Sequence, residues 1–362
     1  PCRLKLIHHG YRPEIVEARH KHERNLSILR ATRDRGAADA YDLYKLATTL
    51  PPWDDGERSL ALEAAWNAGM SRQERERVEW PWWDRLAQSF AMDLARKGAM
   101  SRAVEICQRA NPSDRAAAPL SQGVHAEIHL RSGFCGRALE LATSAIAGIK
   151  GSQGLVAMGG KEEAELEWIA ARAARIGQQR ALFLAHLDRA IELGSLEARC
   201  LRAGWKIAEG IAEGWKELDF LLRTDARHPS VLLTASEAAK SQGDRSTSDL
   251  LLEQAGKIPS DVAQIAKSRL WMRAWLDGKT PRFDLAPFDI EAAAIHGFLA
   301  MIDNVPWRPD PFLHAGALRT TLADILESLL EAGQDQAVRR FAAGAANRDA
   351  DLPGISKLVE GV

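Results

Sequence analysis

One internal repeat constrains the fold of this sequence more than any other feature. Residues 83–111 hold two amphipathic segments separated by the helix stop Lys97-Gly98, and residues 122–148 repeat that pattern around Arg131-Ser132-Gly133. Small residues stand where the two helices of a hairpin must approach closely, and each has a match 35 residues later: Ala91 and Ala126, Ala103 and Ala138, Ala110 and Ala145. A hairpin of this size cannot bury its apolar face alone, so the units must stack on one another.

The pattern resembles the tetratricopeptide repeat, whose unit is about 34 residues long. The resemblance is specific in the two units above and looser in four other segments, of which three have a predicted turn or stop at Gly210, Gly243 or Gly333. We therefore predict an all-α fold of stacked helical hairpins that form a tetratricopeptide-like superhelix with a concave and a convex side. The four weaker hairpins are expected at 40–69, 196–229, 230–259 and 321–345.

Composition limits the class of partner. Lys plus Arg number 48 and Asp plus Glu 49, for a net charge of −1, so no overall field attracts nucleic acid or anionic lipid. No apolar run approaches the roughly 20 residues that span a bilayer. The four cysteines contain no CxxC pair, which favours reduced thiols over a zinc ribbon or a disulfide framework. We expect a cytoplasmic protein that binds proteins rather than nucleic acid or membranes.

Two motifs superficially resemble catalytic or phosphate sites. His125 and His129 share a helix face, but in HAEIH the glutamate is two residues after the first histidine, whereas HExxH needs it immediately after. Partly buried packing histidines are the favoured interpretation. The glycine-rich residues 151–161 fail the phosphate-loop pattern because position 155 is leucine. No catalytic residue is predicted.

Tryptophan is unusually frequent, with 11 residues, and most stand at helical spacing among apolar neighbours. Packing is the expected role for these. Trp80, Trp82 and Trp83 are the exception, because they flank Pro81 just before a helix. This cluster is a candidate exposed site for binding a protein partner.

The first 35 residues differ from the rest. They carry nine Lys or Arg against four Asp or Glu. Residues 4–7 alternate as a short strand would, His8-His9-Gly10-Tyr11 follow, and Pro13 opens an amphipathic helix. A strand that ends at paired histidines and a glycine, followed by a basic helix, is unusual for a repeat protein. It suggests the closing edge of a different, preceding domain.

These residues carry a second resemblance. IHHGY, followed ten residues later by KHERN, resembles a stretch of family 2 glycosyltransferases that carry C-terminal tetratricopeptide repeats. The resemblance implies that His8 completes a divalent-metal site on the diphosphate of a nucleotide sugar. It also implies that Gly10 and Tyr11 shape the adjoining turn, and that the next helix is anchored by Lys21, Arg24 and Asn25.

The resemblance implies that a complete protein would transfer a sugar from a nucleotide-sugar donor, with manganese or magnesium bound. The nucleotide-sugar domain with its metal-binding Asp pair does not precede Pro1 in this sequence. The chain alone is therefore expected to be inactive and without a cofactor, and to serve acceptor binding, partner binding or dimerisation. The alternative is a free-standing tetratricopeptide-like adaptor that binds a peptide or protein.

The predicted domain organisation has four parts. A remnant of the preceding domain and a linking helix come first, followed by clear repeats, divergent helical hairpins, and a C-terminal helical repeat region. The corresponding ranges are 1–35, 36–150, 151–280 and 281–362.

Overall fold

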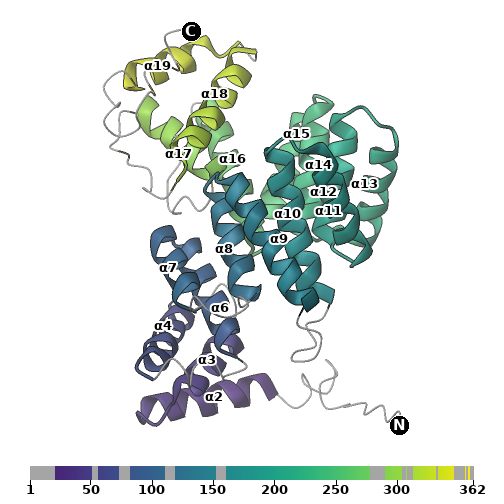
Figure 1. Cartoon of the computed structure of the whole chain (residues 1–362). Coiled ribbons are helices and arrows are strands. Elements are labelled where there is room, and N and C mark those ends of the chain that lie inside the picture. Colours follow the sequence, from purple (N-terminus) through teal and green to yellow (C-terminus); the bar gives the residue numbers. More distant parts are fainter. Residues whose placement is uncertain are drawn as a thin grey trace, which may run out of the picture. The chain divides into compact units, whose positions relative to one another are not determined.

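The structure is a computed structural model that describes residues 21–50, 56–72, 82–110, 119–151, 160–277, 290–303, 307, 313–331, 333–345, 355 and 358. Within these residues there are 17 α-helices and no strand (Figure 1). The predicted all-α class of stacked helical hairpins is therefore confirmed. The predicted strand at residues 4–7 lies outside the described residues.

The chain divides into two compact units, Pro1–Asp93 and Leu94–Val362. The predicted boundaries at 35, 150 and 280 stay predictions. In the first unit the described helices are α2 (Lys21–Asp34), α3 (Ala40–Thr49), α4 (Glu57–Met70) and most of α6 (Trp83–Arg96), which runs across the division.

The core of the first unit is aromatic. Trp83 at the start of α6 stacks on Trp66 of α4 with ring centroids 4.7 Å apart, and Phe90, two turns further along α6, also meets Trp66. Gly69 is required beneath this stack, because a Cβ there would lie 2.3 Å from the Trp83 ring. These contacts hold α4 and α6 together.

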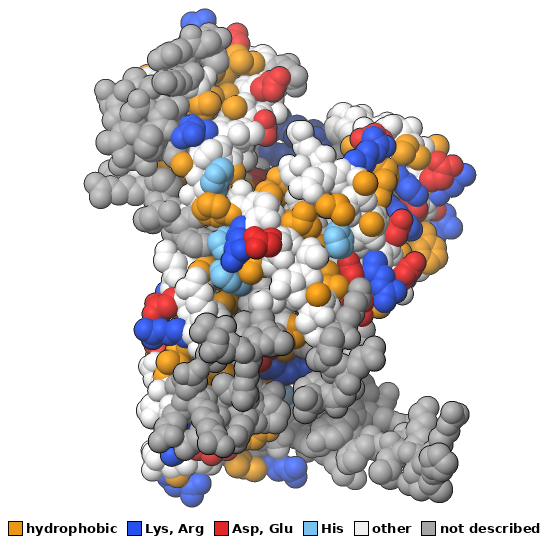
Figure 2. Space-filling view, viewed as in Figure 1, with side chains coloured by type: hydrophobic (Ala, Val, Ile, Leu, Met, Phe, Trp, Pro, Cys, Tyr) orange, Lys and Arg blue, Asp and Glu red, His pale blue; other side chains and the backbone are white. Residues whose placement is uncertain are grey.

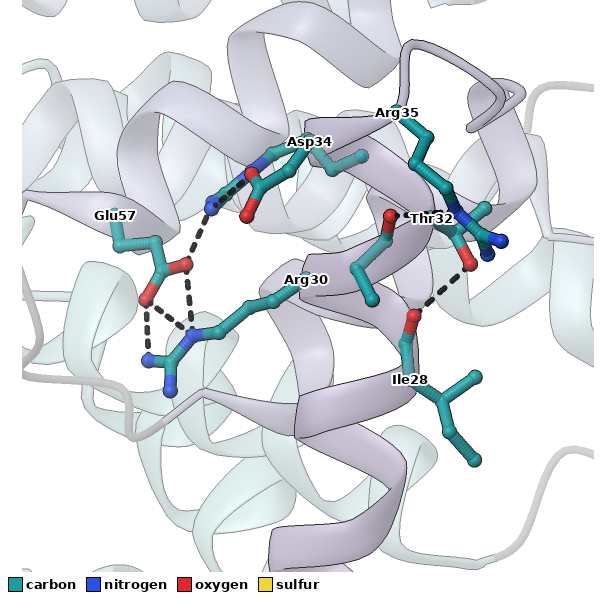
Figure 3. A network of polar contacts seen from close by, with 8 residues as sticks. Ile28, Arg30, Thr32, Asp34, Arg35 and Glu57 are labelled. Carbon is teal, nitrogen blue, oxygen red and sulfur yellow. Dashed lines mark hydrogen bonds and ion pairs between the residues drawn. The ribbon is translucent and has the colours of Figure 1, made fainter.

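Helix α2 is joined to α4 through one acidic side chain (Figure 3). Glu57, at the first position of α4, accepts hydrogen bonds from Arg30 Nε at 3.0 Å and from Arg33 Nη1 at 2.6 Å. Both arginines are more than one-third exposed, so each pair adds little on its own. Because both arginines bind the same carboxylate, the contact sets the rotation of α2 about its own axis and adds little to the stability of the fold.

The second unit is a series of hairpins. Each first helix packs on its own second helix, and several first helices also pack on the next one: α8 on α10, α12 on α14, and α14 on α16. The described helices are α7 (Met100–Ala110), α8 (Pro119–Arg131), α9 (Cys135–Gly151), α10 (Gly160–Ile176), α11 (Arg180–Glu192), α12 (Leu196–Ala208), α13 (Glu213–Thr224), α14 (Pro229–Ser241), α15 (Arg245–Lys257), α16 (Asp261–Leu276), α17 (Ile290–Ile302), α18 (Ala315–Glu331) and α19 (Asp335–Ala345).

The predicted turns are confirmed. Each contains a glycine with φ between +71° and +87°, a backbone region that only glycine adopts without strain. In the α8–α9 turn, Phe134 N donates to His129 O at 2.8 Å, which satisfies a carbonyl at the end of α8. The turn glycines are Gly98, Gly133, Gly210, Gly243 and Gly333.

The predicted close-approach positions are buried as well. All six alanines of the two strongest units are at most 5% exposed: Ala91, Ala103, Ala110, Ala126, Ala138 and Ala145. Small side chains at these points let the paired helices come together, so the 35-residue spacing does reflect packing.

The hairpins continue through the divergent segment, residues 151–280, for which the sequence did not settle the repeat register. Helices α10 and α11 form a hairpin that turns at Gln178, a non-glycine residue with φ +56°. Helices α12 with α13 and α14 with α15 form the next two. None of the helices in the described ranges is both long and apolar enough to cross a membrane.

Candidate functional site

Four consecutive hairpins of the second unit, from α8–α9 to α14–α15, can be compared at one shared register position. Counting back six residues from the turn residue with positive φ gives Glu127 on α8 (133 − 6), Arg172 on α10 (178 − 6), Gly204 on α12 (210 − 6) and Glu237 on α14 (243 − 6). We call these four residues the register row. Three of the four carry charge, and their exposure differs: Glu127 is buried, Arg172 is partly exposed and Glu237 is about half exposed.

The α8 end of the row is a buried carboxylate held by two arginines. Glu127 is 5% exposed. It accepts hydrogen bonds from Arg131, one turn further along α8, and from Arg172 Nη1 at 3.1 Å. Burial opposes the charge on Glu127, but the two guanidinium groups outweigh it and lower the pKa of this carboxyl to about 2. The cluster is therefore charged and fully formed at neutral pH.

Arg172 also lies on an aromatic ring. Its guanidinium stands 4.5 Å from the centroid of Trp168, one turn earlier on α10. The Arg172 side chain is 26% exposed, and Trp168 is half-buried. Trp168 and Glu127 thus hold the arginine from two sides, and about a quarter of its side chain stays exposed.

The α14 end of the row is more exposed. Glu237 accepts a hydrogen bond from Arg269 Nη1 of α16 at 2.7 Å, and Glu291 of α17 accepts from Arg269 Nε at 2.6 Å. Desolvation disfavours the Arg269 cation, but Glu291 and Glu237 outweigh it and raise its pKa. The Glu237 side chain is about half exposed, so its carboxylate remains open to solvent on one side.

Gly204 lies between these ends in the register. A Cβ at this position would meet only the Thr234 methyl, at 3.5 Å, which is an ordinary contact. Close helix packing therefore does not require glycine here. The row therefore has no side chain at this position, which we call the gap and which stands in the register between a basic and an acidic member.

The inner sides of the hairpins carry other ion pairs. Glu167 of α10 is 4% exposed and lies 2.6 Å from His186 Nδ1 of α11. Glu217 of α13 bonds both Arg202 and Lys206 of α12, at 3.1 Å and 2.6 Å. These pairs join the two helices of one hairpin, and their role is structural.

The residues implied by the glycosyltransferase resemblance fall at the start of the chain. His8, Gly10 and Tyr11 lie outside the described residues. Lys21 is the first residue of α2, and Arg24 and Asn25 lie exposed on its first turns. Their anchoring role stays a prediction.

Trp82 and Trp83 of the predicted tryptophan cluster have different environments. Trp80 lies outside the described residues. Trp83 is 4% exposed and belongs to the core. Trp82 is half-buried and stacks on Tyr44 at 5.6 Å, with Tyr41 at 5.4 Å beside it. Partner binding by this cluster stays a prediction, and Trp82 with the exposed Tyr41 is the part of it that reaches the surface.

His125 and His129 are half-buried on α8, as the packing interpretation expected. Their Nε2 atoms lie 3.0 Å apart. In the described part of the chain, no group of three or more His, Cys, Asp or Glu side chains is arranged to hold a metal ion. The described cysteines Cys107, Cys135 and Cys200 lie on helices, and none of them is in a disulfide.

The sequence did not reveal the register row. Its members are ordinary charged residues, and the hairpin turns must be located before their common position becomes visible. The signal was present, because three of the four turns contain a glycine six residues after the row position.

Comparison with known proteins gives a likeness in structure but none in sequence. No family model matches the sequence, and neither does any curated protein. Among solved structures the chain is similar to the crystal structure of YrrB, described as a TPR protein with an unusual peptide-binding site. The match has a TM-score of 0.33 and 19% identity, and covers 54% of this chain and 98% of that one.

This chain is a tetratricopeptide-like helical repeat protein. Its hairpins, glycine turns and buried alanines carry that conclusion. A likeness this distant says nothing about what the register row of this chain binds.

Proposed function

We propose that this chain is an interaction scaffold whose register row binds an extended segment of a partner protein. The observation that supports this is the recurrence of Glu127, Arg172 and Glu237 at one register position, interrupted by a position without a side chain. Buried or half-buried charges at packing positions are costly to fold. Their repetition along successive first helices favours a role in recognition.

The charges specify the partner. Arg172 bonds Glu127 through Nη1, and a guanidinium has five N–H donors, so it can also bond a carboxylate of the partner. Glu127 would not be left without a counter-charge, because Arg131 also bonds it. At the other end, the half-exposed Glu237 suits a lysine or arginine. The expected ligand has an acidic residue, then a side chain that enters the gap at Gly204, then a basic residue.

The test is a selection of peptides from a random display library, followed by affinity measurement with labelled peptides. We expect selected peptides to carry the acidic and basic residues in that order. Arg172→Glu and Glu237→Lys should each weaken binding by about tenfold or more. Reversing the matching charge in the peptide should restore part of the loss.

Arg223→Glu is the matched control, since its side chain is 76% exposed on the second helix α13 and, among the described residues, pairs with Asp219 of the same helix. Circular dichroism checks that each variant is folded. Peptides that bind both row variants as tightly as the wild type would refute the proposal. So would a library that yields no binder.

The second candidate function is that of a helical-repeat part of a family 2-like glycosyltransferase. It rests on the sequence resemblance of residues 7–11 and 21–25 alone, and the match to the motif includes His8. Sequencing the coding region upstream of Pro1 tests it. If no nucleotide-sugar domain with an Asp-x-Asp after a strand is encoded there, this candidate is eliminated.

A further inference from the structure

A pair of imidazoles converges on the surface of α8. His125 and His129 stand four residues apart, so they lie one above the other on the same face of the helix. Their rings are 4.7 Å apart between centroids, and their Nε2 atoms point at one another across 3.0 Å. Figure 2 shows histidine side chains on the visible face over α8, beside a basic and an acidic side chain.

Neighbouring residues hold this geometry. The edge of Phe134 meets the His129 ring at 5.5 Å and 89°, and the other side of Phe134 meets His314 at 4.9 Å. His314 N donates to Ser132 O at 2.8 Å, which ties the α8–α9 turn to the start of α18. Phe134, which is itself held against the start of α18, therefore braces the His129 ring.

The separation of the two Nε2 atoms matches a chelate. With metal–nitrogen bonds of about 2.0–2.1 Å, nitrogens 3.0 Å apart subtend an angle of about 90–100° at the metal. A tetrahedral angle would need the two atoms only a few tenths of an ångström further apart. Small side-chain rotations on α8 supply that.

We propose that His125 and His129 chelate a late first-row transition-metal ion, Zn²⁺ or Cu²⁺, through their two Nε2 atoms. Imidazole suits these ions and not Mg²⁺ or Ca²⁺, which prefer oxygen ligands. Water fills the other coordination positions in the isolated protein. The site does not depend on the proposed function of the register row.

The protonation states support the site. Burial lowers the pKa of both His125 and His129 to about 4, so both rings are neutral at pH 7 and a metal ion does not have to displace a charged proton. In the metal-free pair, one Nε2–H donates to the other Nε2. On metal binding that ring carries its hydrogen on Nδ1 instead, so the imidazoles release no net proton.

One charged group opposes the cation. Arg137 on α9 lowers the pKa of both histidines by its positive charge, and the same charge repels a bound metal ion. Its bond to Glu140, at 2.7 Å, reduces that repulsion. Removing the Arg137 charge should therefore tighten metal binding, the opposite of removing a ligand.

The experiment is isothermal titration calorimetry of the full chain with zinc chloride and with copper chloride near pH 7.5. We expect one site, with Cu²⁺ tighter than Zn²⁺ and no binding of Mg²⁺. Buffers of different ionisation enthalpy should give the same enthalpy for Zn²⁺. His125→Gln and His129→Gln should each weaken Zn²⁺ binding by at least ~10–100-fold. That is the usual cost of losing a group that supports a ligand, and here a ligand itself is lost.

Two further variants make the result decisive. Arg137→Gln, at a half-exposed side chain, should tighten Zn²⁺ binding, and His296→Gln, at a half-buried histidine on α17, should leave it unchanged. Wild-type affinity no greater than that of His129→Gln would overturn the site. An equal loss in His296→Gln, or no change in Arg137→Gln, would overturn it too, and the Arg137 result holds even if a histidine variant unfolds.

Discussion

Arg172 Nη1 of α10 lies 3.1 Å from Glu127 Oε1 of α8, so one ion pair joins two successive hairpins. Glu127 is buried and holds Arg131 as well. Replacing it with glutamine removes the carboxylate that two guanidinium groups share, one of them almost fully buried. We expect Glu127→Gln to lower the free energy of unfolding by about 3–5 kcal/mol, measured by urea denaturation at pH 7.

Glu140→Gln is the matched control, because this glutamate is exposed and, within the described ranges, pairs with Arg137 of the same helix. Its effect should stay within about 0.5 kcal/mol. Equal effects of the two substitutions would mean that the buried pair contributes no more than a surface one.

The same carboxylate predicts a window of acid sensitivity. Its pKa is about 2 when folded, against 4.5 in the unfolded chain, so the unfolded state takes up its proton first as the pH falls. The stability that Glu127 contributes is present above about pH 4.5 and is lost between 4.5 and 2. The difference in unfolding free energy between the wild type and Glu127→Gln should shrink across that window. A difference that stays constant down to pH 2 would contradict the assigned charge state.

The histidine pair predicts a second window at higher pH. Burial lowers the pKa of His125 and His129 to about 4, from 6.5 in the unfolded chain. Between pH 6.5 and 4 the unfolded state takes up protons that the folded state refuses, so stability falls as the pH falls. Nuclear magnetic resonance titration should find both rings neutral at pH 5.5, and His125→Gln should weaken this pH dependence. A pKa near 6.5 for either histidine would show that burial does not lower it.

Much of this fold can be predicted from particular residues. Ala91, Ala126 and their partners mark where helices touch, and Gly98, Gly133, Gly210 and Gly243 mark where the chain turns, because these positions tolerate few other residues. The hairpin of α10 and α11 could not be predicted in this way, because it lacks both the turn glycine and one of the close-approach alanines. Gln178 takes the place of the turn glycine, and Phe183 fills the close-approach position 12 residues after Ala171.

The register row is harder to predict for a different reason. Glu127 and Arg172 are 45 residues apart, and their pairing depends on α8 packing against α10, which is a tertiary fact. A charge on an amphipathic helix ordinarily marks the solvent face. Only the burial of Glu127 and the position of Trp168 under Arg172 distinguish these charges from a solvated surface.

Glycine is needed for packing at one late helix. A Cβ on Gly344 of α19 would lie 2.0 Å from the Met301 carbonyl oxygen of α17, a backbone atom that cannot give way easily. We expect Gly344→Ala to cost about 1–3 kcal/mol or more, seen as a lower thermal midpoint. Gly136→Ala on α9 is the control, since nothing lies within 4 Å of its added Cβ, and it should stabilise the helix slightly. Equal midpoints for the two variants would show that α19 does not pack against α17 in this way.

Gly204 allows stability and binding to be separated. Because its added Cβ would make only an ordinary contact with Thr234, Gly204→Ala should raise the free energy of unfolding by about 0.5–1 kcal/mol through helix propensity. Gly204→Met should also fold, but its longer side chain would fill the row position that stands between Arg172 and Glu237 in the register.

If the gap receives a side chain of the partner, Gly204→Met should weaken the selected peptides by about tenfold or more. Gly136→Met, at an open position on α9, controls for the added methionine and should bind normally. Fluorescence anisotropy with labelled peptide measures both variants. Normal peptide binding by a folded Gly204→Met would exclude the gap from the binding surface and leave the charged ends of the row to act alone.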